Sequence, residues 1–208
     1  MTNAKVLELF SRYRACKELE KWAKEHGGPL AEIWRDCERG DWLLWLAVRA
    51  KIGRRAVVTA ACACARTALV HVLVGEERPR RAIETAEAWT RGEADRAAVR
   101  AAAHAAEDAA FAAYSADAYA AGYAASASAA SAYTTASAAS FAAASTADAA
   151  ADVARDIHAT TNDDGESANT QALADCAELV RAYISAATVE TGMLKQQIPA
   201  ARSVLQGL

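Results

Sequence analysis

Cys62 and Cys64, separated by one residue, are the one close pair of cysteines in this sequence. In a helix, residues two apart point about 200° away from each other, so these thiols are poorly placed to share a metal ion. The sequence has no GxxxxGK[ST] phosphate loop, no HExxH zinc motif and no GxSxG nucleophile turn. We therefore predict no metal, no cofactor and no catalytic residue, and we interpret both cysteines as small buried side chains.

Glu84 and Glu87 are three residues apart, which places both carboxylates on one face of a helix. Such a pair could serve as a general acid and base. The same spacing also favours ion pairs with Arg80, Arg81 or Arg91, and we prefer that structural interpretation. We expect the protein not to be an enzyme, and catalysis by this carboxylate pair remains a separate hypothesis.

Tryptophan is combined with charges of both signs in two segments, 34–45 and 78–89. Trp and Arg dominate the energetically important contacts of protein interfaces, and they also build cation–π and ion-pair networks within a domain. Trp42 and Trp45 are three residues apart, so both can face the core. A structural or partner-binding role is predicted for Asp41, Trp42, Trp45, Arg80, Glu84, Glu87 and Trp89.

Apolar residues between Val6 and Ala23 recur every three or four positions, which predicts one amphipathic helix that ends at Gly27-Gly28-Pro29. Because no strand pattern appears, the fold class is predicted as all-α, an antiparallel array of about seven to nine helices. Asp41 is expected to be the N-cap of one of them. Further helices of the first half are expected at about 30–38, 42–52, 54–74 and 80–91.

Alanine makes up more than half of residues 97–151, and alanine has the highest helix propensity. Long alanine-rich helices are therefore expected in the second half, with a break within 122–131. A loop is predicted at 160–165, followed by a last helix at about 168–196. These elements suggest a single domain over residues 1–198 and a C-terminal tail over 199–208.

Charge is unevenly distributed: residues 1–100 carry a net charge of +5 and residues 101–208 a net charge of −8. The two halves could simply attract each other, or the second half could present an acidic surface to a basic partner. On the second interpretation, the predicted partner-binding residues are Glu107, Asp108, Asp117, Asp148, Asp152, Asp163 and Asp164.

The five cysteines are odd in number, and the first residues lack a basic and then apolar signal pattern. We interpret the chain as cytoplasmic, with free thiols that are mostly buried. Residues 56–74 are nearly all apolar, but Arg66 at their centre disfavours insertion in a bilayer. A buried helix is therefore expected there, and no membrane partner.

Longer composite motifs resemble the Imm-5-like family of immunity proteins. The residues that carry the resemblance are Ala15-Cys-Lys-Glu-Leu, Cys37-Glu-Arg-Gly-Asp-Trp-Leu-Leu-Trp45, Ala60-Ala-Cys-Ala-Cys-Ala-Arg66 and Arg78-Pro-Arg-Arg-Ala-Ile-Glu84. The resemblance covers roughly residues 15–151. It implies a small cytoplasmic helical protein that protects its producer by binding a toxin, with neither catalysis nor a cofactor.

The sequence therefore predicts an immunity-type protein that neutralises a cognate protein toxin by occlusion. An acidic surface would favour a basic toxin domain, such as a nuclease, and direct binding to nucleic acid is not expected. The alternative is an inhibitor or decoy that acts on a nucleic-acid-binding or host-defence protein. Exposed alanine faces also leave a homodimer open. Ice binding by Ser and Thr of the tract is disfavoured by their irregular spacing.

Overall fold

The computed structural model describes residues 1–113, 125 and 162–196, with side chains from residue 167 onward in the last range. The described part is all helical and contains no strand, which confirms the predicted fold class. One 3-10 turn, η1, follows α5. The α-helices are α1 (Asn3–Arg12), α2 (Lys17–His26), α3 (Leu30–Asp36), α4 (Gly40–Arg49), α5 (Arg54–Thr67), α6 (Arg78–Arg91), α7 (Arg96–Phe111), α10 (Asn162–Tyr183) and α11 (Ala186–Lys195).

The long first helix predicted from the apolar stripe is wrong, because the chain breaks between α1 and α2. Arg14 adopts a left-handed conformation with φ of 55°, which a helix cannot contain. Cys16 then starts α2, and its Sγ accepts a hydrogen bond from the backbone N–H of Leu19. Val6 and Leu19 are both buried, so the apolar pattern correctly predicted which residues face the core. It did not predict the break in the chain between α1 and α2.

Helix α4 begins one residue before Asp41, so the predicted N-cap role of Asp41 is wrong. The carboxylate lies in the first turn, where the positive end of the helix dipole favours it, and it pairs with Arg39. The helix expected over 54–74 is also too long. It ends at Thr67, and η1 (Ala68–His71) follows.

Two predictions in the second half are corrected as well. The loop expected at 160–165 is helical from Asn162 onward, because α10 begins there. The single last helix is instead broken between α10 and α11, where Ser185 caps α11 by accepting a hydrogen bond from the N–H of Thr188. Helix α7, at the start of the alanine tract, ends at Phe111. Except for Ala125, the break predicted within 122–131 lies outside the described residues.

The core has two clusters of buried side chains, and α5 belongs to both. Val57 and Cys64 pack with α1–α4, α10 and α11, whereas Val58 and Cys62 pack with α6 and α7. Cys62 and Cys64 thus face opposite sides of one helix, as their spacing predicts, and both are fully buried.

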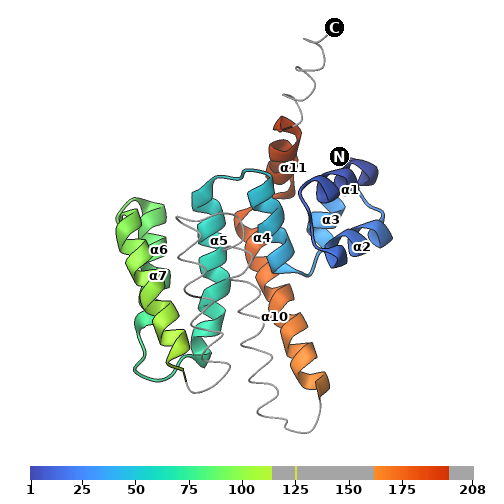
Figure 1. The fold of residues 1–208 in the computed structure, drawn as a ribbon. Helices are drawn as coiled ribbons and strands as arrows, with labels where there is room; N and C mark the ends of the chain where they lie inside the picture. The colour runs from blue at the N-terminus through green and yellow to red at the C-terminus, as the bar shows by residue number, and fades with distance from the viewer. Residues whose placement is uncertain (114–124, 126–161, 197–208) are drawn as a thin grey trace.

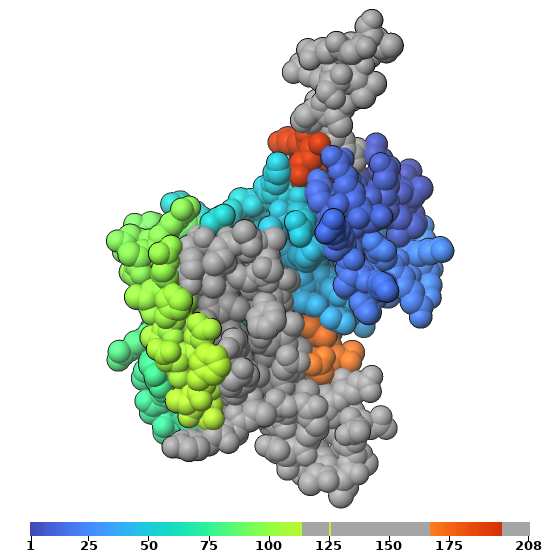
Figure 2. Space-filling view, viewed as in Figure 1, coloured from blue at the N-terminus to red at the C-terminus, as the bar shows by residue number. Residues whose placement is uncertain are grey.

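The helices are arranged around α5 (Figure 1). Helices α4, α5 and α10 contact one another, and α6 and α7 form an antiparallel pair against α5. The first three helices form a compact group beside α4, and α11 contacts α3 and α4. The space-filling view in Figure 2 shows the first helices and α11 meeting at one end of the molecule. Residues that come from distant parts of the sequence therefore share the surface at this end.

Candidate partner-binding groove

Three of the residues singled out from the sequence, Asp41, Trp42 and Trp45, line one open groove of about 510 Å³. The groove lies where the corner between α1 and α2 meets the start of α4. We call it the tryptophan groove, and its lining is Arg14, Cys16, Glu18, Leu19, Arg39, Asp41, Trp42 and Trp45.

Arg39 is held in one orientation by two neighbours in this groove. Its Nε and Nη2 donate hydrogen bonds of 2.9 and 2.8 Å to the two carboxylate oxygens of Asp41. Its guanidinium carbon also lies 4.5 Å from the ring centroid of Trp42, within cation–π range. The hydrogen bonds from Arg39 to Asp41 raise the pKa of Arg39 above its usual value, so its charge is permanent.

The indole rings of Trp42 and Trp45 pack against other aromatic rings on one side and are partly exposed to solvent. The ring of Trp42 is 6.0 Å from that of Trp22, and the ring of Trp45 meets Phe10 edge-on at 6.0 Å. Arg49 also lies 5.4 Å from the ring of Trp45. Neither indole is fully buried, although both pack against the core. Such rings lose little conformational entropy when a partner covers them.

Cys16 is the exposed thiol of this groove, and its surroundings do not activate it. Partial desolvation raises its pKa, and the neighbouring Glu18 adds to that increase. A reactive cysteine needs a lowered pKa, which a positive environment provides. The chemistry available in the groove is therefore contact and hydrogen bonding.

The second tryptophan segment lies on α6, away from the tryptophan groove. Glu87 forms a two-point ion pair of 2.6 and 2.7 Å with Arg66 of α5, so its predicted pairing within its own helix is wrong. Arg80 instead pairs with Glu77 at 3.4 Å, and Glu84 is exposed. Trp89 packs against the cluster formed by α5, α6 and α7. These four residues serve packing and surface charge in the described structure.

The predicted acidic surface falls largely outside the described residues. On α7, Asp108 is exposed and Glu107 is half-buried. Oε2 of Glu107 lies 3.5 Å from Nδ1 of His104. The first turn of α10 contains Asp163 and Asp164, whose side chains lie outside the described part. The remaining members, Asp117, Asp148 and Asp152, lie outside it entirely. The acidic surface therefore stays a prediction.

Sequence reasoning missed Arg39 and the residues of the α1–α2 corner. Arg39 had a local signal, because it stands two residues before Asp41 and three before Trp42. Arg14 had no local signal, since the corner that brings it to α4 interrupts an otherwise continuous apolar stripe. Glu18 stood only within the Ala15–Leu19 segment of the family resemblance.

No family model, curated protein or solved structure matches this chain. The resemblance to the Imm-5-like family therefore remains a prediction from the sequence. Within the residues that the structure describes, no group of three or more His, Cys, Asp or Glu side chains could hold a metal ion. No helix in the same ranges is long and apolar enough to cross a membrane.

Proposed function

We propose that this protein is an immunity-type inhibitor that binds a cognate protein toxin through the tryptophan groove and neutralises it by occlusion. The observation that carries the proposal is the arrangement of Arg39 over Trp42, with Asp41 fixing the arginine. A large rigid indole beside an oriented guanidinium is the combination that dominates binding energy at protein interfaces.

The groove is prepared for binding, because its side chains are already held in place. Trp42 and Trp45 rest on other aromatic rings, and Arg39 is fixed by two hydrogen bonds. Partner binding therefore costs little side-chain entropy, and more of the contact energy contributes to affinity. The charged lining residues Arg14, Glu18, Arg39 and Asp41 balance in sign, which suits the mixed polar surface of a protein.

The lining also comes from segments that carry the family resemblance. Cys16 and Leu19 belong to the first of those segments, and Arg39, Trp42 and Trp45 belong to the second. The α1–α2 corner joins the two segments on one surface. If both segments bind the same partner, that role would explain why residues from each of them line one groove.

Electrostatics favours a basic toxin domain as the partner. Residues 101–208 carry a net charge of −8, and a field of that sign accelerates encounter with a positive protein. The groove would then supply the short-range contacts. This division of roles predicts that added salt slows association more than it accelerates dissociation.

The test begins with the tagged protein and native lysate, at low and then moderate salt. A stoichiometric partner is identified, its toxicity is assayed with and without this protein, and affinities are measured for Trp42→Ala and Arg39→Ala. Each substitution is expected to weaken binding by about 2 kcal/mol, roughly thirtyfold.

Arg35→Ala is the matched control, because Arg35 also forms a two-point pair with its neighbour Asp36 but lies on α3 outside the groove. It should leave affinity unchanged. If Trp42→Ala and Arg39→Ala bind the toxin as tightly as the control, the groove is not the interface. If the partner is a nucleic-acid-binding or host-defence protein with no toxic activity, the decoy function replaces immunity.

A further inference from the structure

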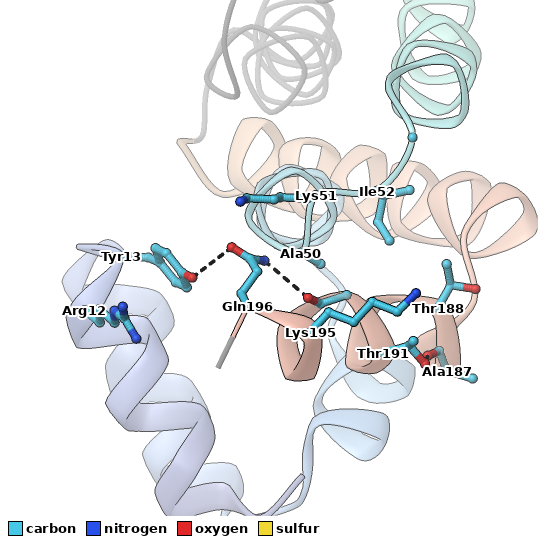
Figure 3. Close-up of a pocket in the computed structure, with 12 residues that line it drawn as sticks. Arg12, Tyr13, Ala50, Lys51, Ile52, Ala187, Thr188, Thr191, Lys195 and Gln196 are labelled. Carbon is cyan, nitrogen blue, oxygen red and sulfur yellow. Dashed lines mark hydrogen bonds between the residues drawn. The ribbon is translucent and has the colours of Figure 1, made fainter. Parts of the chain in front are cut away.

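A second, larger cleft of about 800 Å³ opens between the end of α1, the corner that joins α4 to α5, and α11 (Figure 3). It shares no lining residue with the tryptophan groove. Its volume lies in the range of small-molecule sites, which is about 300–1,000 Å³. We propose that this cleft binds a small molecule that carries two or more phosphate groups.

The charge of the lining supports this class of ligand. Arg12, Lys51 and Lys195 line the cleft, and no Asp or Glu is among its described lining residues. Within the described ranges, none of these three side chains forms an ion pair with a carboxylate. The described lining of the cleft thus contains three basic side chains and no acidic one.

The three charges come from three separate elements, which favours a ligand with several negative groups. Arg12 ends α1, Lys51 occupies the α4–α5 corner, and Lys195 ends α11 (Figure 3). A single small anion carries too little charge to balance three cations, and at an exposed site its attraction is weak and screened by salt. A chain of phosphates places charges on several oxygens and can engage more than one of the three cations.

The walls of the cleft are fixed by a hydrogen-bonded connection through Gln196. The hydroxyl of Tyr13 donates to Oε1 of Gln196 at 3.0 Å (Figure 3). Nε2 of Gln196 donates to the carbonyl of Arg49 at 2.6 Å. One side chain thus ties the ends of α1, α4 and α11 together. The fold therefore fixes the positions of the three helix ends next to which the basic residues lie.

Lys51 itself has an unusual backbone. It adopts the left-handed region with φ of 55°, where glycine is the ordinary residue at the end of a helix. A lysine at this position is strained, yet it places a positive charge at the rim of the cleft. Strained positions are concentrated at ligand sites, which agrees with a binding role for this side chain.

The test is titration calorimetry of the full chain with inorganic triphosphate at low salt. We expect saturable binding that Lys51→Gly and Lys195→Ala each weaken by about fivefold or more. Lys51→Gly also relieves the left-handed strain, so lost binding cannot be assigned to lost folding. The matched control is Lys24→Ala, since Lys24 is an exposed lysine of α2 that does not line the cleft.

Orthophosphate, a nucleoside triphosphate and an acidic peptide complete the titrations. Equal affinity for both triphosphates indicates recognition of the phosphates alone, whereas tighter nucleoside binding adds contacts to the base or sugar. Both of these results support the proposal. Absence of triphosphate binding, equal affinity for orthophosphate, tighter binding of the acidic peptide, or an equal loss in Lys24→Ala would overturn it.

Discussion

Gly192 of α11 lies directly against the backbone of Ala50, the residue that follows α4. A Cβ built on Gly192 would overlap the carbonyl oxygen of Ala50 and would also lie 3.1 Å from its carbonyl carbon. Both atoms belong to the backbone, so no side-chain rotation can relieve the contact. The missing side chain is therefore what allows α11 to approach α4 and to form one wall of the cleft.

This contact predicts that Gly192→Ala is destabilising. Inside a helix, alanine is ordinarily better than glycine by about 1 kcal/mol. Here overpacking should outweigh that gain and lower the free energy of unfolding by about 1–3 kcal/mol. Chemical denaturation of the two proteins measures the difference.

Gly53→Ala is the matched control, because a Cβ on Gly53 meets no atom within 4 Å. Gly53 is the N-cap of α5, where alanine is less favourable than glycine, while alanine also restricts the unfolded chain; these two small effects should nearly cancel. Equal effects at the two positions would show that α11 does not need the close approach.

Replacing either of two residues with left-handed backbones by glycine should instead raise the free energy of unfolding. Arg14 and Lys51 both have φ of 55°, which costs a residue with a side chain about 1–2 kcal/mol. Glycine removes that cost, but it also loses more conformational entropy on folding, which lowers the unfolding free energy by about 0.5–1 kcal/mol. Arg14→Gly and Lys51→Gly should each raise the unfolding free energy by about 0.5 kcal/mol. Lys24→Gly, within α2, should lower it by about 1 kcal/mol, and denaturant titrations of all three test the contrast.

Local sequence signals predicted the helical class and several helix ends. Gly27 and Gly92 end α2 and α6 with left-handed backbones, as a C-terminal glycine does. Asp95 begins α7 as a true N-cap, because its carboxylate accepts a hydrogen bond from the N–H of Ala98. These features depend on neighbours within four residues, which a sequence displays directly.

Other features arise from contacts between distant residues, which the sequence does not display. The breaks at Arg14 and Ser185 lie within continuous apolar stripes, where tertiary packing outweighs helix propensity. Three of the residues that line the tryptophan groove, Asp41, Trp42 and Trp45, were singled out from the sequence because they are neighbours in it. The groove itself was not predicted. The cleft was not predicted at all, since Arg12, Lys51 and Lys195 are brought together only by the packing of α11.

The cysteines predict a simple pattern of chemical reactivity. Cys16 is exposed, whereas Cys37, Cys62, Cys64 and Cys176 are buried. Burial raises the pKa of Cys37 to about 11, and a hydrogen bond with Cys176 together with burial raises that of Cys64. A disulfide reagent at pH 8 should therefore label one thiol of the folded protein and all five after denaturation.

Cys16→Ser identifies the labelled thiol, because this variant should show no reaction while folded. Fast labelling of Cys64 or Cys176 in the native protein would contradict the packing of α5 against α10, which buries both thiols. Mass spectrometry of the labelled peptides distinguishes these outcomes.

Stability at low pH should depend on Glu76, which precedes α6. The guanidinium of Arg78 donates hydrogen bonds of 2.8 and 2.5 Å to its carboxylate, and the backbone N–H of Arg78 donates one of 2.9 Å. These bonds lower the pKa of Glu76 from 4.5 to about 2 in the folded protein. A carboxylate whose folded pKa is depressed stabilises the fold above its unfolded pKa. That contribution is lost as the pH falls from about 4.5 to about 2.

Glu76→Gln should therefore lower the unfolding free energy at pH 7, by about 1 kcal/mol or less because the pair is partly exposed. The difference should nearly vanish near pH 2, where the wild-type carboxylate of the folded protein is about half protonated. Thermal melts between pH 2 and 7 follow the difference. Glu84→Gln serves as the control, since Glu84 forms no ion pair within the described residues. A Glu76→Gln defect of the same size at every pH would mean that the side chain acts by packing and that its charge is irrelevant.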